Sequence, residues 1–184
     1  MLPVLLKFAI IFKKVKGIPH MNTKSISLRS FTPADQTMLL EILTSTKVNK
    51  TYMLPDYEHK EDAIPLFVRL TELSQNPKRF VRCIDLDGTA IGFLNDVEIK
   101  EHAMEVGYVI HPEYHNRGYM TVALSLAINE LFDKGYEEVI CGAFEGNDAS
   151  MRVMEKCGMI RMNYTDTVEY RGKTHNCIYY RIQK

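Results

Sequence analysis

One stretch of the chain restricts the possible folds more than any other part of the sequence. Residues 103–110 (AMEVGYVI) have the β-branched and aromatic content of a strand. Pro112 and Gly118 interrupt this segment, and residues 121–134 then carry apolar side chains at the spacing of one helical face. A strand that passes through a short glycine-containing loop into a long amphipathic helix indicates a layered fold, in which helices pack on a sheet.

The remaining pattern predicts the other strands and helices of such a layer. Further strands are expected at about 25–31, 79–85, 90–99, 139–144, 162–170 and 174–182, and further helices at about 32–44, 59–75 and 148–156. Asp87-Gly88 is a hairpin turn signal, and Thr32-Pro33 is typical of a helix start. The order predicts an α+β (α/β layered) fold with a mixed, largely antiparallel central sheet and helices on both faces. We expect residues 21–184 to form a single domain.

The net charge is zero, because 23 Lys and Arg balance 23 Asp and Glu, but the charge is unevenly distributed. Residues 1–20 carry a net charge of +4, and the rest of the chain therefore carries −4. A mildly acidic domain lacks the clustered Lys and Arg that nucleic-acid phosphates require, so we expect no nucleic-acid partner. A domain with this net negative charge suits a cationic substrate better than a nucleic acid. The composition, 46% hydrophobic and 25% charged, excludes collagen-like, disordered and disulfide-scaffold proteins.

Cysteine and histidine spacing predicts neither disulfides nor a metal site. The four cysteines form no CxxC pair, and a chain of 184 residues can bury a core without disulfides. We therefore expect free thiols and a reducing, cytoplasmic environment. His111 and His115 are four residues apart, but Pro112 between them argues against a helical pair of metal ligands.

The first residues of the chain differ in character from the rest. Residues 1–12 are apolar, but a bilayer core of ~30 Å needs ~20 residues of helix, so no stable membrane insertion is expected. Positive charges follow this run instead of preceding it, which is not the order of a signal peptide. We expect residues 1–20 to be a non-essential extension, with Met21 as an alternative start. A helix that binds a lipid surface or a partner is the other interpretation.

The loop between the central strand and the long helix is a candidate anion site. Backbone N–H groups at the start of a helix lack intrahelical partners and, with the helix dipole behind them, attract a pyrophosphate. Gly118 lets the backbone come close to such a ligand, and Arg117 adds a positive donor. An ordinary strand-to-helix connection is the alternative. The segment matches neither GxxxxGK with Ser or Thr nor GxGxxG, so Walker and Rossmann nucleotide sites are not supported.

Two motifs in this part of the chain resemble the signatures of a known family. Residues 115–120 (HNRGYM) resemble the (Q/R)-x-x-G-x-(G/A) coenzyme A loop of the GNAT superfamily of N-acetyltransferases. Residues 147–159 (NDASMRVMEKCGM) resemble its second signature, N-x-x-(A/S)-x-x-x-(Y)-x-x-x-G-(F). The resemblance covers about residues 25–184 and implies the GNAT fold. Residues 105–114 and the Asn-x-x-Ser form are most like the RimJ/RimL-type branch, which acetylates protein N-termini, including those of ribosomal proteins.

The sequence departs from these signatures at four positions. His115 stands in place of Gln or Arg, Met120 in place of a small residue, Met154 in place of a tyrosine that many members use as general acid, and Met159 in place of phenylalanine. The loop amides remain, so coenzyme A binding is expected to survive. The tyrosine acid, however, is missing from its usual position.

The resemblance implies a cofactor-binding set. The expected coenzyme A contacts are Tyr108, Val109, Ile110, His115, Asn116, Arg117, Gly118, Tyr119, Met120, Thr121, Asn147 and Ser150. The amides around residues 108–110 would hold the thioester carbonyl and the pantetheine arm. Asn147 would bind that arm or cap the following helix. Ser150 is a candidate proton donor to the leaving thiolate or a hydrogen-bond partner of the cofactor, with a purely structural place in the first helical turn as the alternative.

The catalytic base and the acceptor site are also implied by the resemblance. Glu105, three residues before Tyr108, is the first candidate for the general base, with a surface carboxylate as the alternative. Glu145 and His111 are the runners-up. Tyr52 and Tyr57, with Met53 between them and with Tyr179 and Tyr180 near the end of the chain, could line the acceptor cleft. Core packing explains such aromatic residues equally well.

The function implied is direct transfer of an acetyl group from acetyl-CoA to a primary amine, in a ternary complex and without a metal. The main interpretation is an N-acetyltransferase acting on a protein or peptide N-terminus. A small-molecule amine acetyltransferase, for a polyamine or an aminoglycoside, is one alternative. A non-catalytic acyl-CoA-binding module, which Met120 and Met154 favour, is another. A ping-pong reaction through Cys141 would need an adjacent base, which the sequence does not show. We expect a monomer or a homodimer.

Overall fold

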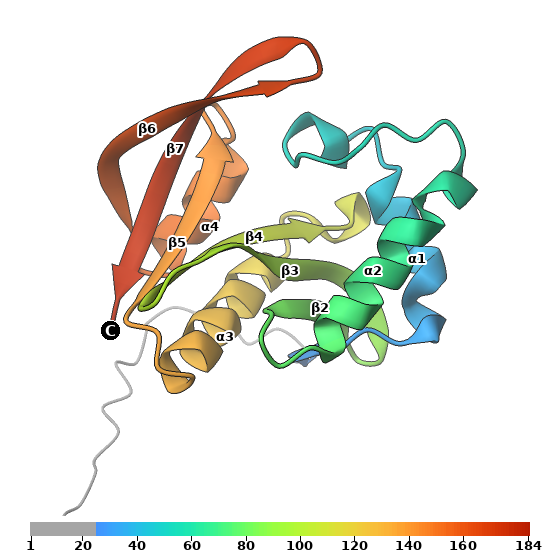
Figure 1. Cartoon of the computed structure of the whole chain (residues 1–184), viewed down its shortest axis with the longest axis horizontal. Coiled ribbons are helices and arrows are strands. Elements are labelled where there is room, and N and C mark those ends of the chain that lie inside the picture. Colours follow the sequence, from blue (N-terminus) through green and yellow to red (C-terminus); the bar gives the residue numbers. More distant parts are fainter. Residues whose placement is uncertain (1–24) are drawn as a thin grey trace, which may run out of the picture.

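The computed structural model describes residues 25–184 (Figure 1). This part of the chain forms seven strands and four α-helices. The strands are β1 (Ile26–Arg29), β2 (Val81–Leu86), β3 (Thr89–Ile99), β4 (Ala103–Ile110), β5 (Glu138–Phe144), β6 (Ile160–Tyr170) and β7 (Lys173–Gln183). The helices are α1 (Gln36–Leu43), α2 (Ile64–Gln75), α3 (Tyr119–Asp133) and α4 (Asp148–Lys156). The extension expected at residues 1–20 lies outside the described residues, and the single domain over residues 21–184 stays a prediction.

The seven strands form one sheet in the order β1-β2-β3-β4-β5-β7-β6. Every neighbouring pair is antiparallel except β4 and β5, which run parallel. The prediction of a mixed, largely antiparallel sheet is therefore confirmed. The parallel ladder contains only three residue pairs and ends at Glu105 and Ile140, after which the two strands separate.

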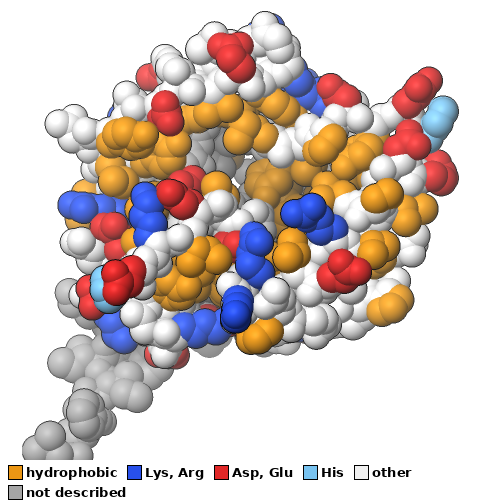
Figure 2. Space-filling view, viewed as in Figure 1, with side chains coloured by type: hydrophobic (Ala, Val, Ile, Leu, Met, Phe, Trp, Pro, Cys, Tyr) orange, Lys and Arg blue, Asp and Glu red, His pale blue; other side chains and the backbone are white. Residues whose placement is uncertain are grey.

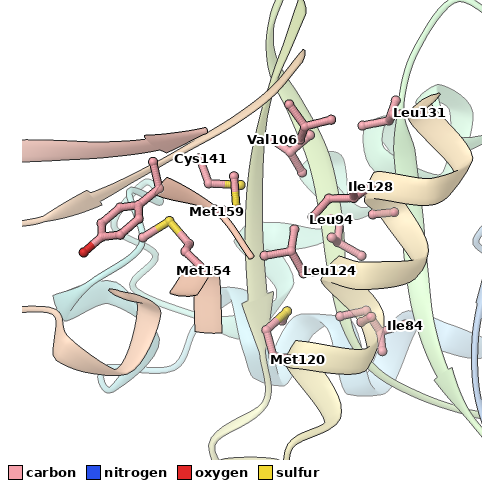
Figure 3. Close-up of a cluster of buried hydrophobic side chains, with 14 of the residues drawn as sticks. Ile84, Leu94, Val106, Met120, Leu124, Ile128, Leu131, Cys141, Met154 and Met159 are labelled. Atoms are coloured by element: carbon pink, nitrogen blue, oxygen red, sulfur yellow. The ribbon is translucent and has the colours of Figure 1, made fainter. Parts of the chain in front are cut away.

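The strands divide their apolar side chains between two cores, one on each face of the sheet. Leu94 of β3 and Val106 of β4 pack with Leu124 of α3 in the core that α3 and α4 cover (Figure 3). Phe93 and Val109, on the opposite face of the same strands, pack in the core that α1 and α2 cover. Helices on both faces are therefore confirmed. Each fully buried Leu or Ile side chain contributes ~1.5–3 kcal/mol to folding.

Local sequence signals explain where the helices begin. Thr32 and Asp35 form a capping box, in which the Thr32 N–H donates to the Asp35 carboxylate at 2.8 Å. The helix expected from residue 59 instead opens with a 3₁₀ turn, Lys60–Ala63, and becomes α-helical at Ile64. Pro65 explains this late start, because proline lacks an N–H and fits the first helical turn. Within residues 25–184, no helix has both the length and the apolar character needed to cross a membrane.

Candidate functional site

A cavity of about 300 Å³ lies where β4 has separated from β5, beside the starts of α3 and α4. Its lining includes Tyr108, Val109, Ile110, His115, Asn116, Gly118, Tyr119, Met120, Thr121, Asn147 and Ser150, all of which the sequence singles out. Tyr52, expected on the acceptor side, also lines it, whereas Arg117, Glu105 and Tyr57 do not. Residues that are distant in the sequence thus meet around one cavity.

The β4 edge of the cavity offers backbone N–H groups that face no neighbouring strand. The His111 N–H donates to the Ile91 carbonyl at 2.8 Å, so alternate residues of β4 turn their N–H and C=O groups toward β3. By this alternation, the amides of Tyr108 and Ile110 face the cavity and that of Val109 faces β3. Because the β4–β5 ladder has ended by this point, the cavity-facing amides can bind a ligand in place of a neighbouring strand.

The start of α3 presents a second set of N–H groups to the cavity. Gly118 precedes the helix with φ of 78°, and Asn116 has φ of 59°. A Cβ built at Gly118 would meet nothing within 4 Å, so glycine is required there by its backbone conformation and not by crowding. The N–H groups of the first turn have no intrahelical acceptor, and the helix dipole adds positive potential. This arrangement can bind a phosphate or pyrophosphate.

The side chains of the loop before α3 hold its shape. The His115 ring approaches the Ile110 carbonyl at 3.0 Å, which ties the loop to the end of β4. The Arg117 guanidinium lies 5.7 Å from the centre of the Tyr114 ring. Met120 is 7% exposed and belongs to the core beneath α3. His115 and Met120, the two departures in the first motif, therefore both make structural contacts here.

The start of α4 forms the opposite wall of the cavity. The Asn147 side chain caps this helix, because its Oδ1 accepts from the Ser150 N–H at 3.3 Å. Its Nδ2 donates to Ser150 Oγ at 3.2 Å, which leaves the Ser150 hydroxyl hydrogen free to point elsewhere. The Tyr108 hydroxyl donates to the Ser150 carbonyl at 3.1 Å, and burial raises its pKa. Met154, at the usual tyrosine position, is fully buried in the core (Figure 3).

Two basic residues that the sequence reasoning missed also line the cavity. Arg152 and Lys156 lie four residues apart on α4 and are exposed. Among the described residues neither forms a salt bridge. The signal was available, because the spacing puts both on one helical face. Together with the N–H groups at the start of α3, Arg152 and Lys156 make the electrostatic potential at this end of the cavity positive.

Glu105 lies on the opposite face of the sheet from Tyr108, at the last residue of the β4–β5 ladder. Its pKa is raised, first by burial and then by the negative charge of Glu98, while Lys100 acts in the opposite direction. Within residues 25–184, its carboxylate has no hydrogen-bond or ion-pair partner. A Cβ built at Gly142 would lie 3.5 Å from Glu105 Oε1, so the carboxylate reaches toward β5 where the strands part.

The other expected acceptor residues are spread over the molecule. The Tyr52 hydroxyl donates to Asn95 Oδ1 near Gly107, and burial raises the pKa of Tyr52. Tyr57 packs against the core beneath α1 and α2, and Met53 is 52% exposed. Tyr180 is buried, and its hydroxyl donates to the Glu155 carboxylate at 3.1 Å.

The alternative catalytic groups lie away from the cavity lining. Glu145 is exposed and accepts a hydrogen bond from Asn176 at 2.9 Å. The His111 ring lies 3.7 Å from the Glu41 carboxylate. Cys141 is fully buried, which raises the pKa of its thiol, so it lacks the thiolate character of a nucleophile. In residues 25–184, no group of three or more His, Cys, Asp or Glu is placed to hold a metal ion.

Comparison with known sequences identifies relatives over most of the chain. Residues 25–160 match the family described as acetyltransferase (GNAT) domain. The chain is 28% identical over 164 residues to the uncharacterized N-acetyltransferase YoaA of Bacillus subtilis (strain 168), covering 85% of this chain and 91% of YoaA. It is 26% identical over 147 residues to the uncharacterized N-acetyltransferase YnaD of the same organism, covering 79% and 85%.

Solved structures share the fold at lower identity. The microcin C7 self-immunity acetyltransferase MccE, in complex with acetyl-CoA and AMP, superposes with a TM-score of 0.77 at 17% identity over 88% of this chain and 94% of that chain. The spermidine N-acetyltransferase of Vibrio cholerae gives 0.73 at 14%, over 88% and 96%. An acetyltransferase of Salmonella typhimurium that modifies the N-terminal serine of ribosomal protein L7/L12 gives 0.75 at 16%, over 88% and 96%.

Proposed function

The chain belongs to the GNAT acetyltransferase family, and we propose that it transfers acetyl from acetyl-CoA to the N-terminus of a protein or peptide. One observation carries the proposal. Where β4 and β5 part, the cavity beside the starts of α3 and α4 extends to Val109 and Tyr52, which lie on the face of the sheet that carries the unpaired Glu105 carboxylate. An acyl donor and an amine could therefore meet at this gap from opposite faces, without a covalent enzyme intermediate.

The cofactor side suits coenzyme A by the chemistry of its donors. The amides at the start of α3 suit the pyrophosphate, while Arg152 and Lys156 suit a further phosphate. The cavity-facing amides of Tyr108 and Ile110 would donate to the pantetheine arm and the thioester carbonyl. Bound acetyl-CoA would supply an acetyl group activated as a thioester.

Glu105 is the proposed general base. A protein α-amine has a pKa of about 8 and an alkyl amine one of about 10.4, so deprotonation at pH 7 costs roughly 1–5 kcal/mol. Burial and Glu98 raise the pKa of Glu105, which makes its carboxylate a stronger base than an exposed one. A proton taken from the ammonium would thus pass to a group adapted to accept it.

Ser150 is the proposed donor of a proton to the departing sulfur. Its Oγ accepts from Asn147, so the hydroxyl hydrogen remains available to the cavity. Met154 cannot take this role, because a thioether has no proton to give and this side chain is fully buried. Asn147 would act on Ser150 by holding its orientation.

The acceptor assignment, to the RimJ/RimL-type branch, rests on sequence. Residues 105–114 and the Asn-x-x-Ser form favour a protein or peptide N-terminus. The related fold of the Salmonella enzyme that modifies a ribosomal protein is consistent with this assignment. The spermidine N-acetyltransferase shares the fold to a similar degree, so a small amine is the second candidate.

The test measures release of coenzyme A thiol from acetyl-CoA in the presence of single acceptors. The acceptors are peptides with free N-termini, the same peptides with N-acetylated ends, spermidine and an aminoglycoside. We expect thiol release with free peptides and none with blocked peptides. Turnover of spermidine or the aminoglycoside alone would move the assignment to small amines. Coenzyme A binding without turnover of any acceptor would favour a binding module.

A further inference from the structure

The imidazole of His111 lies between helix α1 and the loop that leads into α3. Its side chain is only 13% exposed, and its Nε2 lies 3.7 Å from Glu41 Oε2 on α1. Its other ring nitrogen, Nδ1, accepts a hydrogen bond from the Glu113 N–H at 3.3 Å. Val109, two residues earlier in the strand direction, packs in the core beneath α1, which places His111 on the same side. One side chain therefore joins α1 to the cofactor loop.

Burial distinguishes this contact from other contacts between a histidine and an acid. The histidines visible at the edges of Figure 2 (pale blue) lie beside acidic side chains at the surface. His102, for example, also lies 3.7 Å from a carboxylate, that of Glu101, but its side chain is 62% exposed. Exposed pairs contribute little, because water and salt screen them. The His111 ring is shielded from solvent, so its contact with Glu41 is screened less.

The contacts of the two ring nitrogens select one tautomer of His111. A nitrogen that accepts from an N–H carries no hydrogen, so the hydrogen of the neutral ring is on Nε2 and faces Glu41. The other oxygen of the Glu41 carboxylate lies 3.6 Å from Lys60 Nζ, which helps to hold it in place. The lone pair that a general base would use is already occupied by the Glu113 N–H. This arrangement suits a residue that holds the loop and not one that takes a proton from an amine.

The turn that His111 caps carries side chains of the cofactor loop. The Glu113 N–H belongs to the 3₁₀ turn Pro112–Tyr114, and the His111 ring meets the Tyr114 ring edge to face, with ring centres 6.0 Å apart. Tyr114 lines the cavity, and the Arg117 guanidinium lies 5.7 Å from the centre of its ring. The position of the His111 ring therefore affects where Tyr114 and Arg117 lie, and Arg117 is the expected phosphate donor of the loop.

We propose that His111 is a positioning residue for coenzyme A. Glu41 holds the imidazole, and the imidazole holds the turn before α3 in the shape that binds the phosphates of the cofactor. This inference rests on the proposed function for the identity of the cofactor, and it adds α1, on the opposite face of the sheet from α3, to the elements that support cofactor binding. His111 does not line the cavity and acts through Tyr114 and Arg117.

The test measures coenzyme A affinity by calorimetry, and kcat and KM for acetyl-CoA by thiol release. His111→Ala removes both ring contacts, and we expect it to weaken coenzyme A binding at least about fivefold and to raise KM in proportion. Because His111 touches no reacting atom, kcat at saturating acetyl-CoA should stay within about twofold of the unmodified protein. His102→Ala is the matched control, since it removes an exposed histidine–carboxylate contact of the same length, and it should leave the affinity unchanged.

Two milder variants show whether Glu41 acts through His111. His111→Asn keeps an acceptor close to the position of Nδ1 but cannot reach Glu41, and Glu41→Gln removes the charge that faces Nε2. We expect each to weaken coenzyme A binding about threefold. Combining them should weaken binding no further, because either change alone already removes the contact. If the two effects multiply instead, Glu41 does not act through His111 and the inference is overturned. These variants also carry the test if thermal unfolding shows that His111→Ala does not fold.

The outcomes separate this inference from the proposed function. If the protein binds coenzyme A and acetylates an acceptor, yet the His111 variants weaken binding less than twofold, the inference is overturned and the function stands. If the variants show the expected losses of affinity but no acceptor is acetylated, the inference stands and the proposed function fails. A large fall in kcat with unchanged coenzyme A affinity would make His111 a catalytic residue and overturn the positioning role.

Discussion

Replacing Glu105 by Gln would test the proposed base while leaving the shape of the side chain almost unchanged. Gln cannot accept a proton from the amine at any working pH, so only positioning and the cavity amides would remain. General-base catalysis typically contributes ~10²–10⁴-fold to the rate, which corresponds to about 3–5 kcal/mol of barrier. We therefore expect kcat for the best acceptor to fall by at least about 100-fold, with coenzyme A affinity unchanged.

The pH dependence carries the sharper part of this prediction. Burial and then Glu98 raise the pKa of Glu105 above the usual value for a carboxyl group. Glu105 acts as a base only when it is ionised. The pH profile of activity should therefore have an acidic limb, along which activity rises with pH around that raised pKa. In Glu105→Gln this limb should vanish. Glu98→Gln is the matched control, since Glu98 is over half exposed and paired with Lys100 at 2.8 Å. It should move the limb to lower pH and leave the plateau unchanged.

The Glu105→Gln substitution should not lower the stability of the protein, although it lowers the activity. A carboxyl group whose pKa is higher in the folded state binds a proton more readily when folded. Its contribution to stability is therefore fully present below the unfolded pKa and is lost as pH rises through the folded one. At pH 7 the ionised Glu105 opposes folding, and Glu105→Gln should keep or raise the midpoint of thermal unfolding.

The assay for this prediction is initial-rate thiol release from pH 5 to pH 9, together with thermal unfolding at pH 5 and pH 7. An unchanged limb in Glu105→Gln would refute the assignment of the base. If Glu105→Gln lowered the free energy of unfolding at pH 7 by as many kcal/mol as it raised the barrier to catalysis, Glu105 would be a structural residue. Glu145 would then be the next carboxylate to test.

Substitutions at four further residues probe the cofactor side. Gly118→Ala forces a non-glycine residue to φ of 78°, so denaturant unfolding should show a loss of ~1–2 kcal/mol, and calorimetry should show weaker coenzyme A binding. Asn147→Ala removes the α4 cap and should cost ~1 kcal/mol, whereas Asn147→Asp should retain most of it. Removing both Arg152 and Lys156 should weaken coenzyme A binding by roughly 5–30-fold at low salt and less at high salt, because exposed charges are screened.

Local sequence signals predicted the helices and strands and many of the residues that line the cofactor cavity. The α3 pattern, the capping residues at Thr32 and the hairpin turn at Asp87 each act within a few residues of the chain. Gly118 could be identified because its backbone conformation is a local requirement of the turn before α3. The residues of the two motifs then meet because β4 leads into α3 and β5 leads into α4.

The remaining features depend on contacts between distant segments. Arg152 and Lys156 face the cavity because burial of Met154 in the core fixes the rotation of α4. Gly142 has no local signal, since its exposure follows from the end of the β4–β5 ladder and from pairing with Tyr179. Tyr180 follows Tyr179 in β7. It points into the core instead of the acceptor side, because successive residues of a strand face opposite sides.

This alternation along β4 also explains how one strand can serve both substrates. Glu105, Gly107 and Val109 face the acceptor side, whereas Tyr108 and Ile110 belong with the core and cavity beneath α3. A shift of β4 by one residue would exchange the two sets, burying the carboxylate under α3 and turning the Tyr108 hydroxyl away from Ser150. On one side, the antiparallel ladder with β3 fixes the register of β4, and this ladder is irregular only between Asp96 and Glu98. On the other side, the register is fixed by the pairs with β5, which end at Glu105. The same short ladder therefore sets which side of β4 meets the acceptor and where the gap for the acetyl group opens.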